Sequence, residues 1–205
     1  LTSVKRMVKK IKAYAKRNKS SDDFNMHMCF YGNPGTGKTE VARIISGLLY
    51  EVGVLPEAKF VETDASGLIG KYVGETASKT QAKVNDAMGG VLFIDEAYAL
   101  TETSGADSVS SGYGDEAIAV LLKEMEDKRG KFCVILAGYK EQMQKLLSSN
   151  PGFASRIQFS LDFPDYSREE LMQLADLFLS KKQYEITSDA LDKLIDIVDF
   201  FRQQD

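Results

Sequence analysis

Residues Phe30–Thr39 have the sequence FYGNPGTGKT, in which four residues separate Gly32 from a Gly-Lys-Thr triplet. Glycines at this spacing let the backbone turn tightly, so that successive N–H groups can point at an anion without interference from a Cβ atom. In such a loop Lys38 contacts the β- and γ-phosphates of a nucleotide and the Thr39 hydroxyl binds Mg²⁺. The stretch therefore predicts a P-loop for a nucleoside triphosphate. The predicted nucleotide-binding residues are Asn33, Pro34, Gly35, Thr36, Gly37, Lys38, Thr39 and Glu40.

The segments on either side of this loop have the patterns that a P-loop requires. Before it, the apolar run Met26–Tyr31 predicts a buried strand. After it, residues Glu40–Tyr50 carry apolar side chains at helical spacing, which predicts a helix whose N-terminus faces the phosphates. The alternative is a glycine-rich turn that matches the pattern by chance, and these flanking segments disfavour it.

The chain has 205 residues, which is enough for one α/β domain plus a small appendage, and with 43% hydrophobic residues it can form a sizeable core. No run approaches the length of a transmembrane helix, and no signal peptide is visible. Cys29 and Cys133 lie in apolar runs, which predicts buried thiols and favours a reducing compartment such as the cytoplasm. His27 has no cysteine or histidine neighbour at ligand spacing, so we expect no zinc site. The first residue is Leu, so we expect a piece of a longer protein.

The first 19 residues are strongly basic, with eight lysines and arginines and no acidic residue, although the whole chain has a net charge of −4. A basic helix can bind nucleic acid. The same segment carries an apolar stripe at helical spacing, which includes Val4, Val8 and Ile11. This stripe favours a helix docked on the domain over a helix that binds nucleic acid.

Strand and helix patterns alternate along most of the chain, which predicts an α/β fold with a parallel sheet covered on both faces. A serine- and glycine-rich surface loop is expected over residues 101–114. Only helix patterns follow Pro164, so we expect a nucleotide-binding domain over residues 1–166, with an N-terminal helix in 1–19, and the start of a helical domain over 167–205. Strands are predicted at residues 26–31, 59–63, 91–94, 132–137 and 157–161, and helices at 2–18, 40–50, 75–88, 115–128, 140–147, 167–180 and 187–201.

Residues Val91–Glu96 have the sequence VLFIDE, four apolar residues followed by two acidic ones. The apolar residues are typical of a strand buried on both faces, and the carboxyl end of such a strand is where open α/β sheets bind ligands. We predict that Asp95 holds Mg²⁺ through water, opposite Thr39, and that Glu96 polarises the attacking water. An ordinary solvated strand end is the alternative, but the position after a P-loop favours a Walker B pair.

Phosphoryl transfer needs positive charge near the γ-phosphate beyond that of Lys38 and the metal. Arg156 follows a Pro-Gly break and precedes a predicted strand, so we expect it on a surface loop, from which it can reach the nucleotide of a neighbouring chain. The alternative is a surface arginine in an ion pair. The predicted catalytic residues are therefore Lys38, Glu96 and Arg156.

Together these motifs resemble those of an AAA+ ATPase. A narrower resemblance, to the CbxX/CfqX group with the stage V sporulation protein K and the red-type rubisco activases, covers nearly the whole chain. It is carried by Gly67–Thr76 (GLIGKYVGET), Phe93–Leu100 (FIDEAYAL), Ala137-Gly138-Tyr139 and Asn150–Phe153 (NPGF).

The resemblance implies a five-stranded parallel sheet in the order 5-1-4-3-2, followed by a helical lid. It also implies an ATPase that works with Mg²⁺ as a ring, usually a homo-hexamer, in which Arg156 reaches the next subunit's nucleotide. Lys71, Tyr72 and Val73 match a pore loop in which an aromatic ring grips an extended protein client.

Two features depart from the family pattern. Tyr139 is the residue with a hydrogen-bonding side chain in the Ala137-Gly138-Tyr139 segment, where many members place Asn, Thr or Ser to orient the water. The lid arginine that serves as a second sensor in the family is not matched before Asp205, and Arg202 is not assigned to it. We therefore expect ATP binding with poor hydrolysis by this piece alone. A nucleotide-switched assembly module that uses the basic helix, or an ATP-binding scaffold, are the alternatives.

Overall fold

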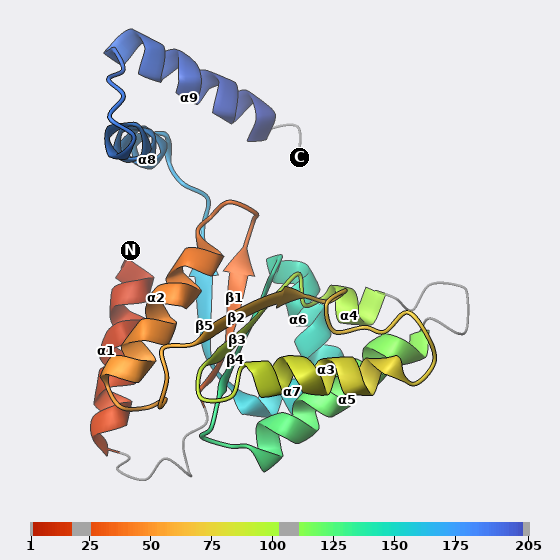
Figure 1. The fold of residues 1–205 in the computed structure, drawn as a ribbon. Helices are drawn as coiled ribbons and strands as arrows, with labels where there is room; N and C mark the ends of the chain where they lie inside the picture. Colours follow the sequence, from red (N-terminus) through yellow and green to blue (C-terminus); the bar gives the residue numbers. More distant parts are fainter. Residues whose placement is uncertain (1, 18–25, 103–110, 203–205) are drawn as a thin grey trace. The chain divides into compact units, whose positions relative to one another are not determined.

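The computed structural model describes residues 2–17, 26–102 and 111–202, and the chain contacts divide it into two compact units, Leu1–Phe163 and Pro164–Asp205 (Figure 1). The strands of the first unit are β1 (His27–Gly32), β2 (Phe60–Asp64), β3 (Val91–Asp95), β4 (Cys133–Gly138) and β5 (Ile157–Phe163). Its helices are α1 (Thr2–Arg17), α2 (Lys38–Glu51), α3 (Glu75–Asp86), α4 (Ala99–Glu102), α5 (Ser111–Asp127), α6 (Lys140–Ser149) and α7 (Pro151–Arg156).

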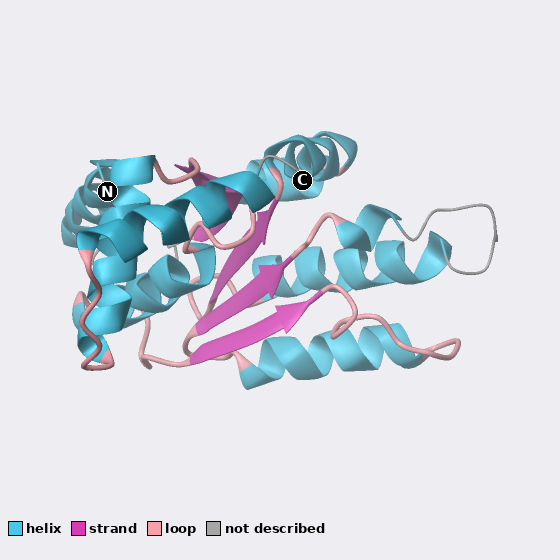
Figure 2. Cartoon of the chain, turned by 90° about the horizontal axis from the view of Figure 1, so that it is seen from above, coloured by secondary structure: helices cyan, strands magenta, loops and turns pink. Residues whose placement is uncertain are grey.

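The strands form a parallel sheet, whose arrows point the same way in Figure 2. Their order is β2-β3-β4-β1-β5, which confirms the predicted order. Because all strands run the same way, the segments that follow β1, β3 and β4 meet at the carboxyl edge of the sheet. The P-loop follows β1, and the Walker B pair ends β3. The topology therefore brings together two motifs that are about 60 residues apart in the sequence.

Alternate side chains of each central strand enter two separate cores, one on each face of the sheet. Leu92 and Ile94 pack with α3, α5 and α6, whereas Val91 and Phe93 pack with α1 and α2. All four side chains are fully buried, as expected for a strand that is apolar throughout. Figure 1 shows the corresponding division of the helices between the two faces.

The basic N-terminal helix α1 docks on the domain through its apolar stripe. Met7 and Ile11 are buried in the core that α1 shares with α2 and the sheet, while Lys5, Lys9 and Lys12 are exposed. This packing is what the docked-helix interpretation predicted. The segment after α1, residues 18–25, lies outside the described residues.

The two cysteines are buried free thiols, as predicted. Burial raises the pKa of Cys29 to about 12 and also raises the pKa of Cys133. Cys133 Sγ donates a hydrogen bond to the Met26 carbonyl oxygen at 2.9 Å. Both side chains therefore serve as core residues that stay protonated at neutral pH.

Two sequence predictions were wrong about local structure. The expected loop before β5 is instead the short helix α7, which ends at Arg156. Pro151 begins this helix, where its fixed φ and missing N–H are tolerated, and Phe153 anchors the helix in the core. The predicted loop over residues 101–114 is partly helical, because α4 extends to Glu102 and α5 begins at Ser111; residues 103–110 lie outside the described part.

The second unit contains α8 (Arg168–Lys181) and α9 (Ser188–Arg202). Helix α8 begins with the predicted capping box, in which Ser167 accepts from the Glu170 N–H and the Glu170 carboxylate accepts from the Ser167 N–H. Arg168 joins the two helices through ion pairs with Asp192 and Asp196. Among the described helices, none has the length and apolar character needed to cross a bilayer.

Candidate nucleotide-binding site

The loop between β1 and α2 makes the tight turn that its glycines predict. Gly35 and Gly37 have φ values of 74° and 89°, in the left-handed region that favours glycine. The Thr36 hydroxyl donates a hydrogen bond to the Asn33 carbonyl oxygen at 2.7 Å and closes the turn. Gly37, the N-cap of α2, offers no side chain to the first N–H groups of the helix. This end of α2 is therefore suited to an anionic ligand.

Gly32, the first residue of the motif, lies against β5. A Cβ atom at Gly32 would come within 2.4 Å of the Phe163 carbonyl oxygen, which is backbone and cannot rotate away. The two residues are paired in the sheet register. The glycine is thus required by close packing as well as by the turn.

Lys38 is held inside the loop by the carbonyl groups that precede the turn. Its Nζ donates hydrogen bonds to the Gly32 and Asn33 carbonyl oxygens, each at 2.9 Å, and the residue is buried. Burial lowers the pKa of Lys38, while the negative charges of Asp95 and Glu96 oppose that shift. The charges of both carboxylates therefore favour the protonated form of Lys38.

The Walker B pair ends β3 in a strained turn. The Asp95 carboxylate accepts a hydrogen bond from the Glu96 backbone N–H at 3.0 Å. Glu96 has a φ of 48°, a left-handed conformation that few non-glycine residues adopt. The next residue, Ala97, donates its N–H to the Ala137 carbonyl oxygen of β4 at 3.0 Å, so the turn is fixed to the neighbouring strand.

A cavity of about 50 Å³ lies where these elements meet. It is lined by Gly32, Pro34, Lys38, Asp95, Glu96, Tyr98, Gly138 and Tyr139. Mg²⁺ prefers oxygen ligands and usually keeps several waters, with one or two protein groups and substrate phosphates completing its shell. The Asp95 carboxylate on this cavity and the Thr39 hydroxyl in the first turn of α2 are donors of that kind, so the residues present fit the ion.

Sequence reasoning placed Tyr139 near the site but missed Tyr98, which together with Tyr139 forms an aromatic wall of the cavity. The rings of Tyr98 and Tyr139 have their centroids 5.8 Å apart. A Cβ atom at Gly138 would come within 2.7 Å of the Tyr98 ring, so the glycine makes room for that ring. The signal in the sequence is a tyrosine two residues after the acidic pair and another after a Gly at the end of β4.

The loop between β2 and α3 exposes the predicted pore-loop residues on an ordered base. Tyr72 and Val73 are 71% and 84% exposed, although the valine and the tyrosine ring are apolar. The Glu75 carboxylate accepts hydrogen bonds from the Lys71 and Tyr72 N–H groups, each at 3.2 Å. Lys79 Nζ donates to two carbonyl oxygens of the same loop. These hydrogen bonds fix the base of the loop, while the side chains of Tyr72 and Val73 at its tip face solvent.

Asp64 is an acidic residue beside the site that does not face the cavity as a free ligand. It ends β2 and pairs in register with Asp95. Its carboxylate accepts hydrogen bonds at 2.7 Å from the Ser66 hydroxyl and from the Gly67 N–H, which lower its pKa. This carboxylate therefore shapes the start of the loop between β2 and α3.

Arg156 does not join the other predicted site residues. It precedes β5, whose far end, Phe163, is paired with Gly32 of the P-loop. Strand β5 has seven residues, so Arg156 and the P-loop of the same chain are separated by roughly 20 Å. An arginine side chain cannot bridge that distance, and the structure thus separates Arg156 from the nucleotide site of its own chain.

The chain is similar to a known protein family, to several curated proteins and to a solved structure. Residues 28–165 match the model of the ATPase family associated with various cellular activities (AAA). The chain is 46% identical over 171 residues to stage V sporulation protein K of Bacillus subtilis, which covers 83% of this chain and 52% of that protein. It is 47% identical over 173 residues to the chromosomal protein CbxX of Cupriavidus necator, which covers 84% of this chain and 53% of that protein.

A third relative is the chloroplastic ribulose bisphosphate carboxylase/oxygenase activase of Cyanidioschyzon merolae, 43% identical over 171 residues, or 83% of this chain and 57% of that protein. The chain thus spans about half the length of these relatives. Among solved structures, the ADP complex of the FIGL-1 AAA domain superposes with a TM-score of 0.62 at 19% identity, covering 95% of this chain and 63% of that chain. That likeness shows the shared fold.

Proposed function

This chain belongs to the AAA family of ATPases, within the group that contains CbxX and CfxQ, and on that premise we propose that it binds ATP with Mg²⁺ and hydrolyses it to ADP and phosphate. The observation that carries the proposal is the cavity on which Lys38, Asp95 and Glu96 converge. A lysine cation beside two carboxylates, at the N-terminus of a helix, is what binding of a metal–triphosphate complex requires.

Four residues at or beside the cavity have separate roles in this proposal. Lys38 neutralises the β- and γ-phosphates, and Thr39 and Asp95 hold the metal. When bound, Mg²⁺ supplies positive charge to the phosphate oxygens and orients them. Glu96 accepts a hydrogen bond from the attacking water, whose oxygen bonds to the γ-phosphorus as the bond to the ADP oxygen breaks. The released proton passes toward Glu96.

Arg156 contributes in a ring, to the nucleotide of a neighbouring copy. The length of β5 between Arg156 and its own P-loop supports this assignment, because the arginine has no route to its own site. An arginine supplied by a second chain is worth on the order of 10³-fold or more in phosphoryl-transfer rate. The active form is therefore a closed homo-oligomer, with a hexamer as the expected size.

The ring acts on a protein client through the loop that presents Tyr72 and Val73. Two exposed apolar side chains on an anchored base support this role, since they contact an extended peptide without reading its sequence. Lys71 adds a positive charge next to them, which favours acidic segments of the client. ATP binding closes the interface between two copies, and hydrolysis moves the loop.

Mixed oligomers test the ATPase proposal. Glu96→Gln and Arg156→Ala should each remove most of the ATP turnover while leaving nucleotide binding in place. In a mixture, the Glu96→Gln copy supplies an intact arginine to the intact site of the Arg156→Ala copy, so turnover should return. A mixture that stays inactive, although the two variants co-assemble, would refute action across the interface.

The pore-loop role has its own test. Tyr72→Ala should leave basal ATP turnover unchanged but remove its stimulation by an unstructured polypeptide. Tyr50→Ala is a matched control, because Tyr50 is an exposed tyrosine on α2. Equal stimulation of the Tyr72→Ala variant and the unaltered chain would refute the client-gripping role.

A further inference from the structure

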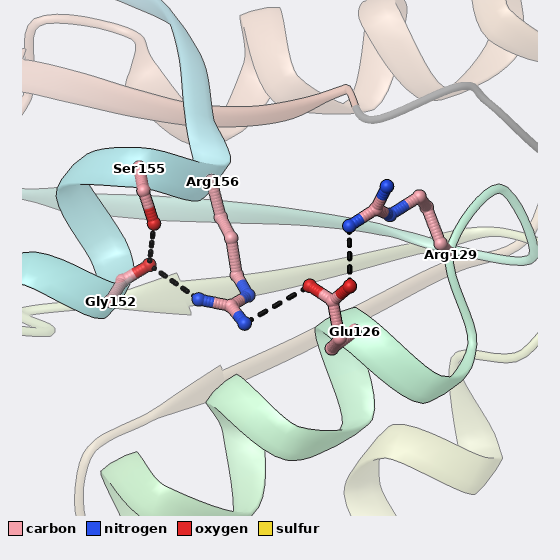
Figure 3. A network of polar contacts seen from close by, with 5 residues as sticks. All are labelled: Glu126, Arg129, Gly152, Ser155 and Arg156. Carbon is pink, nitrogen blue, oxygen red and sulfur yellow. Dashed lines mark hydrogen bonds and ion pairs between the residues drawn. The ribbon is translucent and has the colours of Figure 1, made fainter.

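One carboxylate of α5 lies between two arginines, Arg156 at the end of α7 and Arg129 in the turn after α5 (Figure 3). Glu126 accepts a hydrogen bond from Arg156 Nη2 at 3.0 Å through one oxygen, and its other oxygen accepts from Arg129 Nη2. Arg156 Nη1 also donates to the Gly152 carbonyl oxygen at 3.0 Å. The Arg156 guanidinium is thus held at two points, one on its own helix and one on α5.

Close packing of α7 on α5 creates this arrangement. A Cβ atom at Gly152 would come within 2.8 Å of the Leu122 side chain, so glycine lets the two helices approach. Leu122 lies one turn before Glu126 on α5, and Gly152 one turn before Arg156 on α7. The helix contact therefore brings the carboxylate and the guanidinium side by side.

The Arg156 side chain is restrained although its charge stays available. The side chain is 22% exposed, and its buried Nε has no hydrogen-bond partner among the described residues. Its two contacts to Glu126 and Gly152 therefore fix the plane of the guanidinium. A free arginine would instead lose more rotamer entropy on meeting a phosphate.

The two arginines leave the cluster of Glu126, Arg129 and Arg156 with a net positive charge. Hydrogen bonding from Arg129, with the charges of Arg129 and Arg156, holds the pKa of Glu126 below its ordinary value. The carboxylate is ionised at neutral pH and cancels one of the two positive charges. One positive charge therefore remains to interact with a phosphate. If Glu126 paired with Arg156 alone, the pair would have no net charge.

We propose that Glu126 is the positioning residue of Arg156: it aims the guanidinium at the triphosphate of the neighbouring copy, and Arg129 keeps Glu126 from cancelling the arginine's charge. The inference deepens the proposed function and rests on it. Glu126 does not touch the nucleotide. Its loss therefore lowers the rate of the chemical step, whereas the affinity of the nucleotide site for ATP stays the same.

Steady-state ATP turnover by Glu126→Ala tests the inference. The kcat should fall by between about ten- and a hundredfold with KM nearly unchanged, which is the cost of misplacing a transition-state group. Glu126→Gln keeps one oxygen acceptor but loses the charge, so its kcat should lie between those of Glu126→Ala and the unaltered chain. Asp127→Asn is the matched control, because Asp127 is an exposed carboxylate one position further along α5, and its turnover should match that of the unaltered chain.

Mixed oligomers separate a positioning role from general damage. Glu126→Ala should regain turnover when mixed with Glu96→Gln, which supplies an intact arginine. It should not regain turnover when mixed with Arg156→Ala, because both defects then lie on the same side of the interface. A subunit with general damage would not show this pattern, in which Glu96→Gln restores turnover and Arg156→Ala does not.

Each other outcome decides between the two proposals. If Arg156→Ala loses turnover but Glu126→Ala does not, the positioning role is refuted and the proposed function stands. If Glu126→Ala is faster than the unaltered chain, Glu126 restrains the arginine, and the positioning role is again refuted. If Arg156→Ala itself keeps full turnover, the action of Arg156 across the interface fails, and the role of Glu126 fails with it.

Discussion

His27 should make the stability of this domain depend on pH. The residue begins β1 and is 2% exposed, with its ring edge against Phe132. Its Nδ1 accepts a hydrogen bond from the Val134 N–H at 2.9 Å, which requires that nitrogen to be unprotonated. Burial lowers the pKa of His27 from 6.5 to about 3, against an opposing hydrogen bond to the Met125 backbone. The folded chain therefore keeps a neutral imidazole well below neutral pH.

The sign and size of the effect follow from the two pKa values. Between pH 6.5 and about 3 the unfolded chain binds a proton at His27 that the folded chain does not bind. The contribution of His27 to the free energy of unfolding is therefore fully present above pH 6.5 and is lost as the pH is lowered through this range. At pH 5 the loss relative to pH 7 is about 2 kcal/mol, since one pKa unit corresponds to about 1.4 kcal/mol.

Urea unfolding followed by circular dichroism at pH 7 and pH 5, at constant ionic strength, measures this loss. The comparison is His27→Asn, whose Oδ1 can accept from the Val134 N–H but does not titrate. The substitution costs stability at both pH values, and the carboxylates titrate alike in both proteins. Comparing the loss of unfolding free energy between pH 7 and pH 5 in the two proteins therefore isolates the contribution of the imidazole. The unaltered chain should lose about 2 kcal/mol more than His27→Asn. Equal losses in the two proteins would refute the buried neutral histidine.

Four further substitutions have outcomes that the structure sets. Lys38→Ala should weaken ATP binding about ten- to a hundredfold in a fluorescent-nucleotide titration, because a charged hydrogen-bond donor is lost; unchanged affinity would remove the P-loop assignment. Gly32→Ala should destabilise the fold by about 1–3 kcal/mol, because the new Cβ meets the Phe163 carbonyl oxygen at 2.4 Å, whereas Gly47→Ala, in open space within α2, should stabilise it by roughly 0.5–1 kcal/mol in the same urea titration. Ser167→Ala removes the capping box of α8 and should cost about 1 kcal/mol in thermal unfolding; no change would show that the cap is dispensable.

Features that depend on local pattern were available from the sequence. The P-loop needs glycines at fixed spacing between a strand and a helix, and the Walker B pair needs an apolar strand before it; both patterns lie in short, continuous stretches. The alternation of elements determined the parallel α/β class for the same reason. The order of the strands came from the resemblance of the motifs to a family, since pairing partners are not encoded in periodicity.

Contacts between distant segments were decided by the tertiary structure. Glu126 and Arg156 are 30 residues apart and meet because a glycine lets two helices approach, which no local pattern announces. The same holds for the Tyr98 ring, which lies over Gly138 at the end of another strand. The sequence alone determined the glycine-rich turn, its flanking strand and helix and the acidic pair, from which triphosphate binding is predicted, because each of these patterns lies in one short, continuous stretch. The fold decided which charges face one another, because that depends on how closely whole elements pack.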